Sequence, residues 1–109
     1  MQHAAPHSPT RSTAATGAQA DQIARHLVTA RLAACVQMQP ITSIYRWDGR
    51  IETAGEVVLL IKTRAGLFEA VASAIKQLHT YDTPEILMTP LSAIDPTYRA
   101  WLFSETADS

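Results

Sequence analysis

The sequence of 109 residues contains one cysteine, four glycines and no asparagine, and only 17% of its residues are charged. With Cys35 alone, the chain forms no internal disulfide. The formal net charge is −1, which gives no general attraction to nucleic acid or to anionic lipid. We see neither an apolar run long enough to span a membrane nor an apolar leader. We therefore expect a cytoplasmic protein without a membrane or nucleic-acid partner.

Common catalytic arrangements are also missing from the sequence. The glycines form no phosphate-binding loop, and no Ser-His-acid order or pair of carboxylates with metal-ligand spacing is present. We therefore expect that the protein is not an enzyme and requires no cofactor.

The stretch from Val36 to Lys62 is the most informative part of the chain. Two apolar, β-rich arms are joined at Asp48-Gly49, and Asp-Gly between such arms is a strong hairpin signal. Each arm would reach roughly 40 Å at about 3.3 Å per residue, whereas a compact chain of this size has a radius of gyration of about 13 Å. The arms should overhang the domain. Because an overhanging apolar ribbon exposes unpaired strand edges, we expect the protein to associate with itself.

The remaining elements follow from apolar periodicity and breaker residues. Helical spacing predicts helices over 18–32 and 65–79, both packed on one face of the sheet. The apolar run 57–61 is typical of a central strand, and Pro40 predicts a bend or bulge in the first arm. A short strand is expected over 85–91, followed by a last helix capped by Asp95 with proline at its first position. The predicted class is α+β.

Residues 1–17 carry Pro6 and Pro9 and show no alternating apolar pattern. We predict an irregular N-terminal segment there, followed by a single domain over 18–109.

Four motifs occur in order along the chain: RLAACV at 31–36, SIYRWDGRIE at 43–52, EVVLLIKT at 56–63 and LHTYDTPEI at 78–86. In these motifs the sequence resembles the CutA divalent-cation tolerance proteins, over roughly residues 18–103. The resemblance implies a ferredoxin-like βαββαβ sandwich with a long bent β-hairpin and a short C-terminal helix. It also implies a homotrimer built on the hairpin, and a link to tolerance of copper and other divalent cations.

The N-terminal segment departs from the pattern of this family. Its members open with an apolar strand that lies between the third and fourth strands of the sheet. Two prolines in that place would remove backbone donors in mid-sheet, so the first strand is doubtful in this chain. Some members also carry a cysteine, suggested as a metal ligand, where this chain has Ser12.

Three residues are candidate ligands for Cu(II) or another divalent cation. His79 and Glu85 flank the loop HTYDTPE, and imidazole nitrogen with carboxylate oxygen suits such an ion. Two ligands make a weak site, which would be completed at a subunit junction. In the alternative interpretation, His79 caps the second helix and Glu85 binds a neighbouring loop. His3 could form a square-planar Cu(II) site with the terminal amine and two backbone nitrogens, or could belong to a tail that binds nothing.

Large apolar side chains near the hairpin turn are candidates for the subunit interface: Ile44, Tyr45, Trp47 and Ile51. A nucleic-acid stacking role would need aromatic residues on the central strand 57–61, which has none. The basic residues Arg46, Lys62 and Arg64 are expected to pair across strands with acids such as Glu52 and Glu56; the alternative is an anion site.

Two other functional classes share the architecture that the resemblance implies. The acylphosphatases share the ferredoxin-like fold but use an asparagine to position water, and this sequence contains none. A trimeric small-molecule or partner-binding module resembling the nitrogen-regulator signalling proteins stays open, although the long signalling loop of those proteins is missing here.

Overall fold

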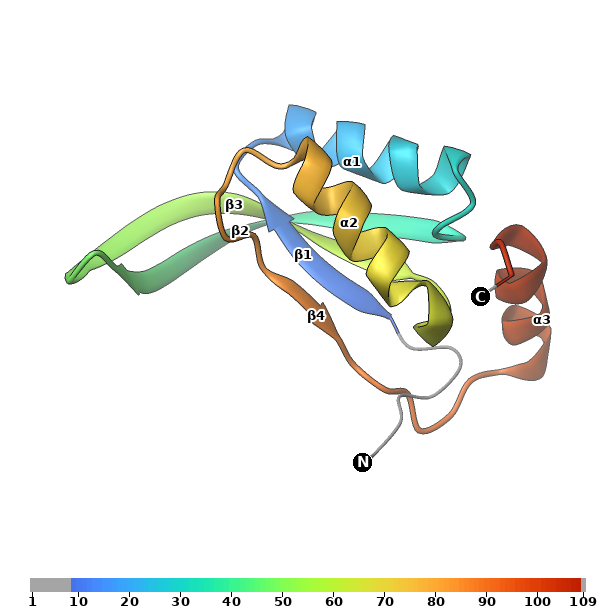
Figure 1. Cartoon of the computed structure of the whole chain (residues 1–109). Helices are drawn as coiled ribbons and strands as arrows, with labels where there is room; N and C mark the ends of the chain where they lie inside the picture. The colour runs from blue at the N-terminus through green and yellow to red at the C-terminus, as the bar shows by residue number, and fades with distance from the viewer. Residues whose placement is uncertain (1–8, 109) are drawn as a thin grey trace.

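The structure is a computed structural model that describes residues 9–108. Strands and helices follow in the order βαββαβ, with a further helix at the end, which confirms the predicted α+β class. The four strands form one antiparallel sheet in the order β2-β3-β1-β4 (Figure 1). The elements are β1 (Thr10–Ala14), α1 (Gly17–Thr29), β2 (Cys35–Trp47), β3 (Arg50–Lys62), a 3-10 turn η1 (Ala65–Leu67), α2 (Phe68–Leu78), β4 (Ile86–Met88) and α3 (Pro96–Glu105).

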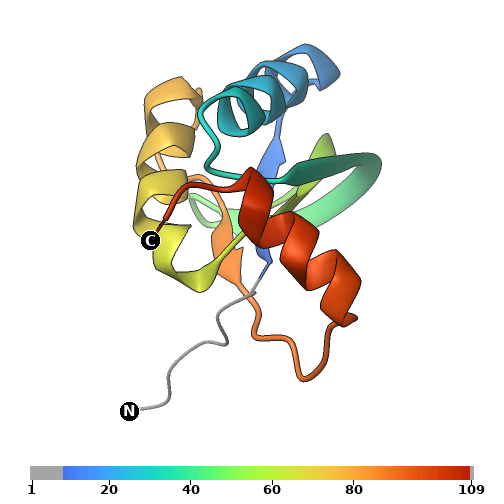
Figure 2. The ribbon, with the colours of Figure 1, turned by 90° about the vertical axis from the view of Figure 1, so that its right-hand side faces the viewer.

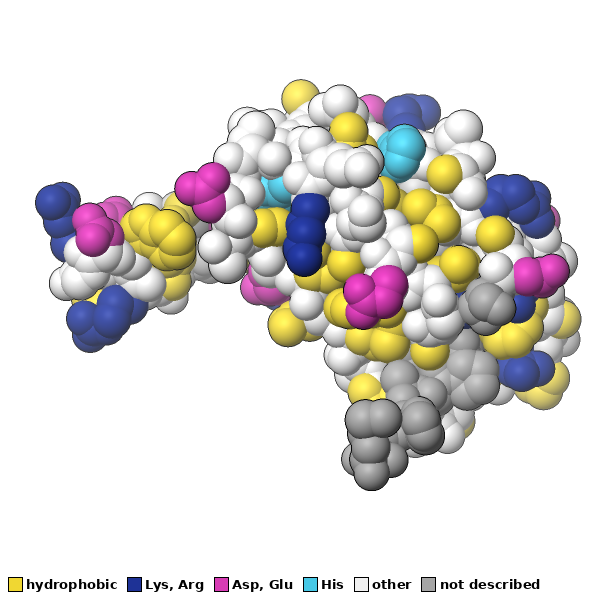
Figure 3. All heavy atoms as spheres, in the orientation of Figure 1, with side chains coloured by type: hydrophobic (Ala, Val, Ile, Leu, Met, Phe, Trp, Pro, Cys, Tyr) yellow, Lys and Arg dark blue, Asp and Glu magenta, His cyan; other side chains and the backbone are white. Residues whose placement is uncertain are grey.

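Strands β2 and β3 form the predicted long hairpin. Its two-residue turn has positive φ at both positions, 51° at Asp48 and 75° at Gly49, as a primed turn requires. The hairpin projects beyond the globule, and Figure 3 shows charged side chains of both signs at its tip and a hydrophobic patch behind them. The molecule measures 44 × 31 × 21 Å with a radius of gyration of 14.4 Å. The predicted overhang is confirmed.

Pro40 does not produce the bulge that the sequence suggested. Pairing of β2 with β3 runs one to one from Cys35↔Lys62 to Trp47↔Arg50, with Pro40 opposite Val57. Strand β2 is an edge of the sheet, and an edge strand tolerates a residue without a backbone donor. The ribbon bends smoothly instead (Figure 1).

The prediction that residues 1–17 are irregular is wrong for residues 10–14, which form β1. Thr10 pairs with Ile61 of β3 on one side and with Met88 of β4 on the other. Both prolines precede this strand, so each of its residues keeps a backbone donor. The sequence lacks a visible alternation of apolar and polar residues here because the side chains at the helix-facing positions are small. These residues are Thr10, Ser12 and Ala14, and all three are buried. The folded unit therefore includes Thr10, and residues 1–8 lie outside the described part.

Helices α1 and α2 lie side by side on one face of the sheet (Figures 1 and 2). Helix α1 starts where the Thr16 hydroxyl accepts from the backbone N–H of Gln19, and ends three residues earlier than the periodicity predicted. The second predicted helix divides into η1 and α2. The core between helices and sheet consists of fully buried aliphatic side chains, the largest being Ile23, Leu27, Leu59, Ile61, Val71 and Ile75.

Helix α3 lies at the end of the molecule opposite the hairpin tip (Figure 1). The predicted cap is confirmed, since the Asp95 carboxylate accepts from the backbone N–H groups of Thr97 and Tyr98 at 3.1 Å. The other end of the helix is held by two arginines. Arg31 donates to the carbonyl oxygen of Ser104, and Arg64 donates to that of Phe103. Arg64 thus serves a helix terminus, where cations are favoured, rather than the acids of the hairpin.

Candidate functional site

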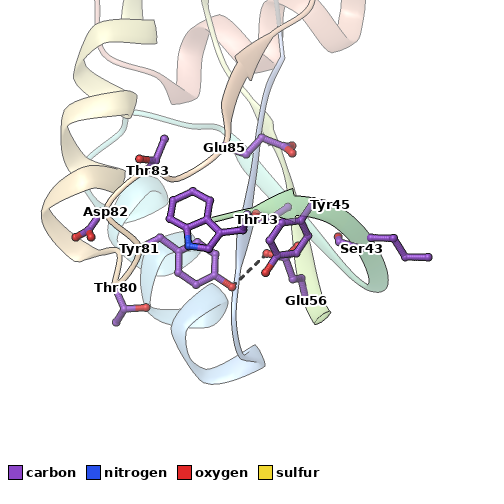
Figure 4. A pocket seen from close by; sticks show the side chains of 11 residues that line it. Thr13, Ser43, Tyr45, Glu56, Thr80, Tyr81, Asp82, Thr83 and Glu85 are labelled. Atoms are coloured by element: carbon purple, nitrogen blue, oxygen red, sulfur yellow. Dashed lines mark hydrogen bonds between the residues drawn. The ribbon is translucent and has the colours of Figure 1, made fainter. Parts of the chain in front are cut away.

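A groove of about 710 Å³ extends from the root of the hairpin toward its turn. One wall is β2 near its turn, the floor comes from β1 and β3, and the other wall is the loop between α2 and β4 (Figure 4). The side chains of three aromatic residues and three acids face it together with hydroxyl groups, and no lysine, arginine or histidine is among them. The lining residues are Thr13, Ser43, Ile44, Tyr45, Trp47, Glu56, Thr80, Tyr81, Asp82, Thr83 and Glu85.

Tyr81 and Glu56 meet in this groove. The Tyr81 hydroxyl donates to a carboxylate oxygen of Glu56 at 3.2 Å, across the groove from loop to sheet (Figure 4). Burial raises the pKa of Tyr81 above its usual 10.0, and the negative charge of Glu56 and its hydrogen bond raise it further. Tyr45 contributes a smaller increase. The side chains that line the groove therefore carry net negative charge.

His79 lies beside the groove and has both ring nitrogens engaged. Nε2 donates to the backbone carbonyl of Thr13, and Nδ1 accepts from the backbone N–H of Tyr81 at 3.0 Å. A carbonyl can only accept and a backbone N–H can only donate, so the ring is neutral with its proton on Nε2. The ring also packs on Tyr81 at 4.5 Å between centroids. In this arrangement His79 has no free nitrogen lone pair for a metal.

Glu85 also has a partner within the chain. Its carboxylate accepts from Arg11 Nε at 3.0 Å, in an ion pair that is close to half exposed. Among the described residues, no group of three or more His, Cys, Asp or Glu side chains is placed to hold a metal ion. The predicted pair of ligands therefore does not make a metal centre within one chain. His3 lies outside the described residues.

The four candidate interface residues are all exposed, but they divide between two faces of the hairpin. In the observed register, Ile44 lies opposite Thr53 and Ile51 opposite Arg46, which puts both isoleucines on one face as diagonal neighbours. Their side chains are 72% and 63% exposed. Tyr45 and Trp47 belong to the other face and line the groove. Ile44 therefore borders the groove at its rim.

The sequence did not identify the groove, although it identified the loop that forms one wall. The motif HTYDTPE directed attention to its two outer residues, whereas the residues between them, Tyr81 and Asp82, line the groove. Glu56 was expected to form a cross-strand pair, and it binds Tyr81 instead. The signal available in the sequence was the tyrosine itself, because large amphipathic rings are enriched where one side of the ring packs and the hydroxyl stays polar, as at binding surfaces.

Solved structures of related proteins have the same fold. CutA1 from Oryza sativa superposes with a TM-score of 0.93 at 33% identity, covering 97% of this chain and 98% of the other. The periplasmic divalent cation tolerance protein CutA from Archaeoglobus fulgidus gives 0.90 at 34% identity, covering 91% and 97%. None of the described helices has the length and apolar character needed to cross a membrane.

Sequence comparison gives the same relatives. The divalent-cation tolerance protein CutA of Pectobacterium atrosepticum is 43% identical over 91 residues, which is 83% of each chain. Protein CutA of Mus musculus is 41% identical over 88 residues, and the match spans half of the mouse protein. The family model for the CutA1 divalent ion tolerance protein matches residues 10–105. By fold, by sequence and by the extent of this match, the chain belongs to the CutA1 divalent ion tolerance protein family.

Proposed function

We propose that the protein acts in divalent-cation tolerance as a homotrimer, in a role that is not enzymatic. The observation that carries the proposal is the projecting hairpin with Ile44 and Ile51 exposed side by side. Full burial of one isoleucine side chain contributes about 1.5–3 kcal/mol, so two on each copy supply a substantial part of an interface. Family membership supports the link to divalent cations.

The geometry of the hairpin favours a ring of copies over a two-fold pair. The hairpin extends to one side of the globule, so it can lie on the next copy while its own globule receives the hairpin of the preceding one (Figure 1). Contacts of this head-to-tail kind close into a ring when the rotation between copies permits it. Strand β2 pairs with β3 alone in the described part of the chain, so its outer edge is free to take part.

The assembly is tested by light scattering of purified protein at micromolar concentration. The wild type should have three times the mass of the chain, and Ile44→Asp should shift the protein toward the monomer because a charge cannot be buried in that contact. Val28→Asp is the matched control, since Val28 is also exposed but lies on α1. A folded wild-type monomer would remove the proposal.

We propose that any divalent metal is held weakly and between subunits. Within one chain, His79 is engaged by Thr13 and Tyr81, and Glu85 is paired with Arg11. A metal ion would have to displace these contacts, at the cost of the hydrogen bonds that they make. Calorimetric titration with copper(II) tests this point: His79→Ala should weaken binding, whereas His26→Ala, on the exposed face of α1, should not. Equal titrations for both variants and the wild type would exclude His79 as a ligand.

The role in tolerance itself needs a cellular test. In a strain deleted for its own copy of this gene, copper sensitivity should be relieved by the wild-type chain and by Val28→Asp, but not by Ile44→Asp. Unchanged copper sensitivity of the deleted strain would contradict the tolerance role, whatever the state of assembly.

A second function is favoured by the groove: a small-molecule-binding regulatory module. A volume of about 710 Å³ lies within the range of roughly 300–1,000 Å³ that is typical of ligand sites. Its mixture of aromatic walls and a few polar groups is also typical of such sites. Compounds that bind the folded state would raise the unfolding temperature, by more for a tighter ligand at the same concentration, which a thermal-shift screen measures.

A further inference from the structure

The groove at the root of the hairpin combines aromatic side chains with unneutralised carboxylates. Tyr45, Trp47 and Tyr81 supply the rings. Of the acids, Glu85 is neutralised by Arg11, whereas Glu56 and Asp82 form no ion pair with any described residue. Aromatic ring faces and carboxylates both attract cations. We propose that the groove binds a linear aliphatic diamine or polyamine, with Glu56 as the anchor for one ammonium group.

The carboxylate of Glu56 has capacity left for a ligand. From side chains of the described residues it accepts one hydrogen bond, that of the Tyr81 hydroxyl at 3.2 Å. A carboxylate has about four lone-pair positions, so it can accept further bonds from an ammonium group. The raised pKa of Tyr81, caused by burial and then by the charge of Glu56, keeps the phenol in its neutral, donating form. The bond from Tyr81 therefore leaves the charge of Glu56 available to a ligand.

The arrangement of the charges favours an elongated organic cation over a metal ion. In Figure 4 the ring of Tyr81 lies between the side chains of Glu56 and Asp82, which extend to opposite sides. A metal ion needs several ligands within coordination distance, and the described residues offer no such cluster. A diamine places two charges at a distance and covers the ring between them with its methylene chain.

The inference deepens the small-molecule function proposed for this groove and does not depend on the trimer, because all of its residues belong to one chain. Of the two isoleucines on the opposite face of the hairpin, Ile44 borders the groove and Ile51 is not among its lining residues. Light scattering of the samples used for titration gives their oligomeric state, so the trimer and the diamine site are tested separately. A monomer that binds a diamine would contradict the trimer alone, and a trimer that binds none would contradict the diamine site alone.

The test is calorimetric titration of the full chain with putrescine, with 1,4-butanediol as the neutral compound of matched length. Putrescine should bind, more weakly as salt is added, and the diol should not. Glu56→Gln should weaken putrescine binding about tenfold or more, since hydrogen bonds to charged groups are strong. Glu69→Gln is the matched control, because it removes the same charge from the first turn of α2, at the end remote from the groove. Equal affinity of Glu56→Gln and the wild type would overturn the proposal, as would binding of the diol or no binding of putrescine.

A second measurement locates the ligand. In Tyr81→Phe the aromatic ring remains and only the hydroxyl that donates to Glu56 is lost, so putrescine affinity should be retained. In Tyr81→Leu the ring itself is lost, and putrescine affinity should fall a few-fold. In nuclear magnetic resonance spectra of the wild type, putrescine should shift the signals of Tyr81 and of the Trp47 indole. Shifts confined to Asp48, Gly49 and Arg50 at the hairpin turn, with the Tyr81 signals unchanged, would show surface attraction only and would overturn the assignment.

Discussion

The imidazole of His79 joins the end of α2 to the central strand β1. Nε2 donates to the carbonyl oxygen of Thr13, 66 residues away in the sequence, while Nδ1 accepts from the backbone N–H of Tyr81. One side chain therefore fixes the loop that carries Tyr81 against the sheet that carries Glu56. His79 acts as a positioning residue for the groove, and its two hydrogen bonds give the histidine at the C-terminal end of α2 a structural role.

His79→Ala should destabilise the protein by about 1–3 kcal/mol, because the Thr13 carbonyl and the Tyr81 N–H both lose their partner. Urea unfolding measures the change. His26→Ala, which alters an exposed histidine of α1, should change the free energy of unfolding by less than about 0.5 kcal/mol. If both variants unfold alike, the hydrogen bonds of His79 do not stabilise the fold.

Two buried threonines should respond in opposite directions to replacement by valine. Thr10 is 1% exposed and its hydroxyl has no hydrogen-bond partner among the described residues, so Thr10→Val should be neutral or stabilise the protein by about 1 kcal/mol. Thr63 is fully buried and donates to the carbonyl of Leu32 at 2.6 Å. Thr63→Val should therefore destabilise by about 1–3 kcal/mol, as measured by thermal and urea unfolding. The same sign of change for both would contradict this account of the two hydroxyl groups.

Arg64→Ala should loosen α3. The side chain is 15% exposed, donates to the Phe103 carbonyl and the Thr106 hydroxyl, and lies over the Phe103 ring at 4.3 Å. Loss of these contacts should cost about 1.5–3 kcal/mol and should speed hydrogen exchange in α3 more than in α2.

The control for this variant is Arg25→Ala. Arg25 forms an exposed pair with Asp21 one helical turn away, and such pairs contribute about 0.5 kcal/mol or less. Exchange rates in α3 that stay unchanged in Arg64→Ala would show that Leu102, the buried apolar residue of α3, suffices to hold the helix.

Glu56→Gln should lower the pKa of Tyr81, because it removes the negative charge while the effect of burial remains. In the wild type the folded state holds the phenolic proton more tightly than the unfolded chain, so stability falls as pH rises above about 10. That loss should be smaller in Glu56→Gln. Ultraviolet absorbance of the phenolate measures the titration, and Tyr81→Phe identifies the signal.

Tyr98 provides an internal reference for this titration. Burial also raises its pKa, with a contribution from Cys35 and none from Glu56. Its titration should therefore be the same in Glu56→Gln and the wild type. A shift of Tyr98 in the variant would indicate a general change of structure rather than a local effect of charge.

Prediction from the sequence succeeded where the cause was local and failed where it was not. Asp48-Gly49 predicted the hairpin because two consecutive positive φ angles select these residue types, and Asp95-Pro96 predicted the start of α3 for a similar reason. Strand β1 was missed because Thr10, Ser12 and Ala14 lack the apolar side chains that signal a buried face. Their burial depends on the helices that cover them.

The amino-acid order alone determined the long hairpin, the helix periodicities and the family, because each depends on neighbouring residues or on the linear order of motifs. The folded arrangement decided the role of each polar side chain. Glu85 accepts a hydrogen bond from Arg11, which is 74 residues away in the sequence. Tyr81 donates to Glu56, which is 25 residues away. Neither pairing can be recognised in the sequence. A titratable group takes its partners, and with them its chemistry, from the segments that folding brings beside it.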